Sequence, residues 1–130
     1  MVILIVKLVP VLGTVVLIGA VVQVFLGYQV AGGSPGLRDT HMLIGIIGLV
    51  LVVALAGIPF RAKTGTIYSK VTMVVLAIIV LIQVIMGFQI LGGGEALVTS
   101  HQATGFLIVI LSLIMGGISF GRAKRQSRPA

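Results

Sequence analysis

His41 and His101 are the only two histidines in the chain, and they lie 60 positions apart. Imidazole nitrogens are common metal ligands in proteins. Sliding the sequence against itself by the same 60 positions superimposes the two histidines together with several glutamines and glycines. A pair of histidines at equivalent points of two repeats is suited to hold a metal centre from two opposite sides.

Each half of the chain carries one pattern, Gln-Val-x-x-Gly-(Tyr/Phe)-Gln-(Val/Ile)-x-Gly-Gly, followed by a short loop and His-x-x-x-Gly. The pattern runs from Gln23 to Gly45 in the first half and from Gln83 to Gly105 in the second, and the match extends over about forty positions without a gap. Chance can align the leucines and valines of an apolar chain, but it does not readily align the glutamines and the only histidines. We therefore interpret the pattern as a duplication, with repeats at about residues 8–60 and 68–120.

The composition predicts a membrane protein. Hydrophobic residues make up 58% of the 130 residues and charged residues 8%, with a mean hydropathy of +1.29, whereas a soluble domain carries about a quarter charged residues. Each of four apolar stretches is near or above the roughly 20 residues that a membrane helix needs, while a membrane strand needs only about 10 in an alternating pattern. We expect an all-α membrane protein, a four-transmembrane-helix bundle made of a duplicated two-helix hairpin in one domain (1–130). The expected spans cover about residues 8–30, 40–60, 70–91 and 99–120.

The net charge of +7 follows membrane topology rather than a nucleic-acid surface. Basic residues gather in the connection between the second and third spans and in the tail 121–130, whereas the opposite side of the membrane has one arginine and both acidic residues. The apolar run near the N-terminus continues past Val30 without a cleavage site, as in a retained helix rather than a signal peptide. We expect a multi-pass protein of the cell membrane with both termini cytoplasmic, in contact with the lipid bilayer and with no nucleic acid. The basic residues are Arg61, Lys63, Lys70, Arg122, Lys124, Arg125 and Arg128.

Residues with good helix N-cap chemistry come just before each histidine: Asp39-Thr40 before His41, and Thr99-Ser100 before His101. They predict that both histidines lie in the first turn of their helices, near the outer membrane surface and at matching depth. A haem iron needs two axial ligands on opposite faces of one plane, and two neutral imidazoles give a b-type centre. We therefore expect a bis-histidine haem b.

A bare metal ion fits the sequence less well. Zinc or copper normally takes three or four protein ligands. The chain has no cysteine, and its only carboxylates, Asp39 and Glu95, are not equivalent under the repeat. Haem brings four nitrogens of its own and asks the protein only for the axial pair.

Glycines and glutamines accompany the histidines at helical spacing. A glycine four residues after each histidine lies on the same helix face and leaves room for a porphyrin. A glutamine and a glycine at positions i and i+4 of the preceding span face the same cavity. Glycines also serve close helix packing, and glutamines also bond across helices, so both readings stay open. The residues are Gly45, Gly105, Gln23, Gly27, Gln83 and Gly87.

Arg38 lies three residues before His41, about one helical turn outward. An arginine there suits a haem propionate at the membrane surface. The alternatives are an ordinary surface pair with Asp39 or contact with a lipid head group.

The chain resembles one half of the haem A synthase family, in which histidines open the second and fourth helices of each four-helix bundle. The Gln-Val-x-x-Gly segments and Ser100-His101-Gln102 carry this resemblance. The catalytic bundle of that family has a glutamate three residues before the second-helix histidine and an arginine just after it, where this chain has Arg38 and Met42. The family's external cysteine pair is also missing. The resemblance therefore implies the non-catalytic bundle that holds haem b.

These observations predict a membrane-bound b-type cytochrome in which His41 and His101 ligate the haem iron. Electron transfer is expected between a quinol or another redox partner and a further subunit of a respiratory or oxidase-type membrane complex. We expect this chain to be a small subunit of such a complex or to form a homodimer. A minimal haem A synthase-like enzyme is one alternative. The other is a cofactor-free structural membrane subunit whose histidines are only polar contacts.

Overall fold

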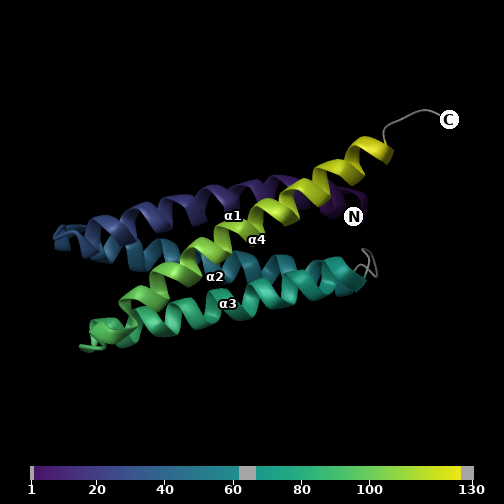
Figure 1. Ribbon diagram of the computed structural model, residues 1–130. Coiled ribbons are helices and arrows are strands. Elements are labelled where there is room, and N and C mark those ends of the chain that lie inside the picture. The colour runs from purple at the N-terminus through teal and green to yellow at the C-terminus, as the bar shows by residue number, and fades with distance from the viewer. Residues whose placement is uncertain (1, 62–66, 127–130) are drawn as a thin grey trace.

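The computed structural model describes residues 2–61 and 67–126. Four long helices follow one another along the chain, and a short 3-10 turn precedes the second and the fourth (Figure 1). The expected basic positions Lys63 and Arg128 lie outside the described residues. The elements are α1 (Val2–Ala31), η1 (Pro35–Leu37), α2 (Arg38–Arg61), α3 (Ile67–Leu91), η2 (Glu95–Leu97) and α4 (Val98–Gln126).

All four helices are long and apolar enough to cross a bilayer, over Val11–Ala31, Pro35–Ile58, Ile67–Leu91 and Glu95–Gly117. Large apolar side chains such as Phe25 and Val50 cover the outside of the bundle, with 60% and 63% of their surface exposed. An outer surface of this kind is stable when lipid surrounds it. The predicted all-α, four-helix membrane bundle is therefore confirmed, with α1 and α4 longer than the expected spans.

The order of the helices around the bundle decides where the histidines meet. α1 packs against α2 and α4, and α3 packs against the same two helices. α2 and α4 thus lie diagonally across the bundle from each other, and their facing sides are separated by its interior. The start of α1 and the end of α4 lie at one end of the bundle, and the turns that lead into α2 and α4 lie at the other (Figure 1).

The two turns at that far end have the same backbone geometry. Gly33 and Gly93 adopt positive φ angles of 97° and 99°, which glycine tolerates best. The amide of each glycine and that of the following residue donate back to the last turn of the preceding helix, which is the Schellman pattern of helix termination. The bonds are Gly33 N to Val30 O (3.2 Å), Ser34 N to Gln29 O (2.9 Å), Gly93 N to Ile90 O (3.0 Å) and Gly94 N to Gln89 O (3.0 Å).

The N-cap prediction for Asp39-Thr40 and Thr99-Ser100 is wrong, because α2 already begins at Arg38 and α4 at Val98. In each hairpin a 3-10 turn runs directly into the helix, and in the first one Pro35 fixes a helical φ at the start of that turn. The consequence drawn from the caps still holds: each histidine is the fourth residue of its helix, in the first turn.

The packed core lies in the middle of the bundle, deeper than the histidines. Val52 is only 2% exposed and packs with Leu76, Val80 and Ile108. A second cluster, Leu55, Ala56 and Met73, continues toward the end where α1 starts. The part of the bundle between this core and the Schellman turns is more loosely filled, and it contains the polar residues.

Candidate functional site

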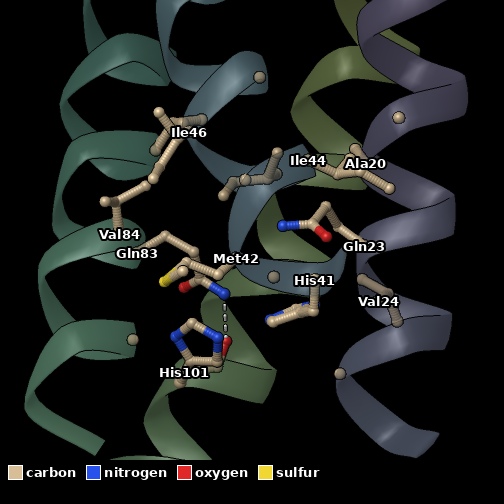
Figure 2. Close-up of a pocket in the computed structure, with 18 of the residues that line it drawn as sticks. Ala20, Gln23, Val24, His41, Met42, Ile44, Ile46, Gln83, Val84 and His101 are labelled. Carbon is tan, nitrogen blue, oxygen red and sulfur yellow. Dashed lines mark hydrogen bonds between the residues drawn. The ribbon is translucent and has the colours of Figure 1, made fainter. Parts of the chain in front are cut away.

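A cavity of about 420 Å³ lies between this core and the Schellman turns, and all four helices line it. Volumes of this size are typical of sites for organic ligands. Figure 2 shows side chains from both repeats around it. Every site residue predicted from the sequence lies in its wall: Gln23, Gly27, Arg38, His41, Gly45, Gln83, Gly87, His101 and Gly105.

The two imidazole rings come from diagonal helices and approach each other across the cavity. Their centroids are 5.9 Å apart, and their planes are inclined by 72°. A metal held by one nitrogen of each ring at about 2 Å requires ring centroids about 6 Å apart. Because rings can rotate about such a nitrogen–metal–nitrogen axis, a large angle between the planes is compatible with it. The spacing thus suits one metal centre gripped from both sides.

Each histidine also has an unsatisfied nitrogen. The Nδ1 atoms of His41 and His101 are buried and have no hydrogen-bond partner. A buried polar atom without a hydrogen-bond partner costs about 1–3 kcal/mol of folding free energy. The two rings therefore have the features of a binding site rather than of a fully hydrogen-bonded interior.

The glycines make room for the polar side chains of the site itself. A Cβ atom at Gly27 would lie 3.2 Å from Cε1 of His41, and one at Gly87 would lie 3.5 Å from Cε1 of His101. At Gly45, a Cβ atom would meet Nε2 of Gln23 at 2.6 Å.

The same relation holds at Gly105, where a Cβ atom would lie 3.2 Å from Nε2 of Gln83. Gly45 and Gly105 thus make room for the glutamine amides, as in close packing between helices. Their place beside a porphyrin stays a prediction.

The two glutamines differ in their bonding. Gln83 Nε2 donates to the His101 carbonyl oxygen at 2.7 Å, and its Oε1 accepts a hydrogen bond from the Thr104 hydroxyl. The first repeat has Ile44 in place of Thr104, and Gln23 Oε1 is buried without a partner. Thr104 is not among the residues predicted from the sequence, although its hydroxyl three residues after His101 is the signal that identifies it.

Charge is placed unequally around the cavity. Arg38 is the first residue of α2 and lines the cavity at its outer edge, whereas the equivalent position in the second repeat is Val98. The carboxylates Asp39 and Glu95 are not among its lining residues. Within residues 2–61 and 67–126, no three histidine, aspartate or glutamate side chains come together as an ion site. The arrangement can therefore hold a group that needs two protein ligands and one cationic contact.

No protein-family model, curated protein or solved structure matches the chain.

Proposed function

We propose that this chain is a membrane b-type cytochrome that binds one haem between His41 and His101 and transfers electrons. The observation that carries the proposal is the approach of the two rings across the cavity, with centroids 5.9 Å apart. Haem asks a protein for two axial nitrogens on opposite sides of a plane, and this pair comes from opposite sides of the bundle. When bound, the haem supplies one-electron redox chemistry at its iron.

The residues around the rings support this ligand over a bare ion. His41 and His101 supply one nitrogen each, and the guanidinium of Arg38 at the cavity edge pairs with a carboxylate of the ligand. The remaining wall is mostly apolar, which excludes water from the site. A zinc-type ion needs further protein ligands, and among the described residues none gather beside the histidines.

The resemblance to the haem A synthase family supports haem as the ligand and electron transfer as the activity. Catalytic oxidation of a haem substituent is disfavoured because Arg38 and Met42 stand where the family's catalytic bundle has a glutamate and an arginine. The absence of both carboxylates from the cavity wall points the same way. We therefore propose an electron carrier rather than a minimal haem A synthase-like enzyme.

The location proposed for the site is the outer leaflet of the cell membrane, with both termini in the cytoplasm. Arg61 and Lys70 belong to the end of the bundle where α1 starts, and cytoplasmic connections are rich in such residues. The bundle has no extramembrane domain within its described residues. We propose that it works beside another membrane subunit of a respiratory or oxidase-type complex, or as a homodimer, with a quinol as a candidate redox partner.

A haem titration tests the proposal. Purified protein titrated with haem should develop a low-spin spectrum that saturates at one haem per chain. His41→Ala and His101→Ala should each abolish this spectrum, whereas Tyr68→Phe, at an 82% exposed position outside the cavity, should retain it. A wild-type protein that takes up no haem would favour the cofactor-free structural subunit. Conversion of haem O after co-expression, detected by mass analysis of the extracted haem, would favour the enzyme.

A further inference from the structure

The two repeats differ where the cavity is deepest. The first repeat has Gly19, Ala20 and Gly48 at positions where the second has Ile79, Val80 and Ile108. Two glycines and an alanine thus stand on one side of the site where three large side chains stand on the other.

The large residues fill the second-repeat side, since Val80 and Ile108 belong to the packed core with Val52. On the first-repeat side, a Cβ atom at Gly19 or Gly48 would meet nothing within 4 Å, and both glycines line the cavity. The cavity therefore continues between α1 and α2.

We call this extension the first-repeat channel; its residues are Val15, Gly19, Ala20, Gly48 and Leu51. From Gln23 to Val15 the helix advances by about 12 Å at a rise of about 1.5 Å per residue. Its wall is apolar throughout. These residues suit a hydrocarbon chain and offer no side-chain hydrogen bond to a polar group.

A hydrogen-bond acceptor stands where the channel opens into the main cavity. Gln23 lies one helical turn above Gly19, its side chain lines the cavity, and its buried Oε1 has no partner (Figure 2). The equivalent oxygen of Gln83 is already bonded to Thr104. The acceptor is thus available only on the side that has the channel, and it requires a donor such as a hydroxyl group.

We propose that the first-repeat channel binds the single hydrocarbon chain of a hydroquinone, one of whose hydroxyls donates a hydrogen bond to Gln23 Oε1. The hydroxyl and the chain follow from the channel and the acceptor. The choice of a hydroquinone among such amphiphiles rests on the proposed electron transfer. In the bilayer the chain passes from one apolar surrounding to another, so the fit of the channel and the hydrogen bond at Gln23 decide the preference.

Direct binding tests the inference on the full chain purified without added haem and placed in lipid nanodiscs. Three radiolabelled probes are compared by equilibrium dialysis against empty nanodiscs: a decyl hydroquinone, its methyl analogue and the decyl compound with both hydroxyls methylated. Relative to the amount of each probe dissolved in the lipid, the decyl hydroquinone should bind at least about threefold more tightly than the methyl analogue, because only its chain makes packing contacts in the channel. Methylation of the hydroxyls should weaken binding roughly threefold to tenfold, as expected for one lost hydrogen bond.

Variants that give the first repeat the residues of the second test the position of the channel. Gly48→Ile and Gly19→Ile should each reduce decyl hydroquinone binding to the level of the methyl analogue and leave the methyl analogue unaffected. The matched control is Gly13→Ile, because Gly13 is also free of neighbours within 4 Å but does not line the cavity. Gln23→Leu should remove the preference for the hydroxylated over the methylated probe. Circular dichroism and size exclusion check that each variant folds.

Equal binding of all three probes would overturn the inference, as would decyl binding that neither isoleucine variant weakens. A co-purified phospholipid that decyl hydroquinone does not displace would assign the channel to a bilayer chain and would likewise overturn it. The comparison of the three probes uses only the wild-type chain, so it remains valid even if a variant misfolds. Because these measurements use haem-free protein, they fail or succeed independently of the haem titration.

Discussion

Thr104→Val should destabilise the bundle by about 1 kcal/mol, because it removes the hydroxyl that donates to a part-buried amide oxygen. The substitution keeps the shape of the side chain and deletes only its hydroxyl. Gln83 would keep its 2.7 Å bond to the His101 carbonyl oxygen, but its Oε1 would be left without a partner. Leaving a buried acceptor unsatisfied costs about 1–3 kcal/mol, and a part-buried acceptor lies at the lower end of that range.

Thr72→Val is the matched control for this prediction. Thr72 donates to the Tyr68 carbonyl oxygen at 2.8 Å, four residues back in its own helix. The Thr104 hydroxyl also lies 2.8 Å from the Ser100 carbonyl oxygen, and it shares its single proton between that oxygen and Gln83 Oε1. Only Thr104 has an amide partner on another helix, so Thr72→Val should change the free energy of unfolding by at most about 0.5 kcal/mol.

Unfolding of both variants in mixed detergent micelles, followed by circular dichroism, measures the difference. A Thr104→Val variant that unfolds at the same denaturant concentration as Thr72→Val would refute the reasoning. It would mean that Gln83 is not held by Thr104, and that the contrast between Gln83 and Gln23 does not exist.

Three further predictions use the packing of the bundle. Gly27→Ala should weaken haem binding more than Gly87→Ala, because its Cβ atom lies 3.2 Å rather than 3.5 Å from the histidine ring; equal haem affinities in the titration would contradict this. Gly93→Ala, at a φ of 99°, should cost about 1–2 kcal/mol of unfolding free energy, whereas Gly36→Ala, in open space, should cost little; equal losses would contradict the turn geometry. Val52→Ala should cost about 2 kcal/mol through the cavity that it leaves in the core, and a loss below about 0.5 kcal/mol in the same assay would contradict its central place.

The sequence was sufficient for the fold and for the residues around the cavity. Apolar length gives the four helices, and the offset of 60 positions brings His41 and His101 to the same place in their helices. Polar residues in the middle of a membrane helix avoid lipid, which places Gln23, Gln83 and the two histidines in the interior, whereas Gln29 and Gln89 near the helix ends are exposed.

The finer features needed coordinates, since these helices are apolar on nearly every side. The sequence has Gly19 in the first repeat where the second has Ile79, and Ile44 where the second has Thr104. It does not show which of these positions face the interior of the bundle. The helix starts were misplaced because Asp39 and Thr99 have good cap chemistry, whereas the 3-10 turns begin the helices before them. The role of Gly45 as room for Gln23 likewise depends on the distance between two helices.

The reduced-minus-oxidised absorption spectrum of the purified protein, compared with those of its two single histidine variants, tests the central claim most directly. If His41 and His101 are the axial ligands, the wild-type protein shows the sharp α-band of a low-spin b-type haem, and both His41→Ala and His101→Ala lose it. A wild-type protein supplied with haem that shows no such band, or a band that survives in either variant, would contradict the claim.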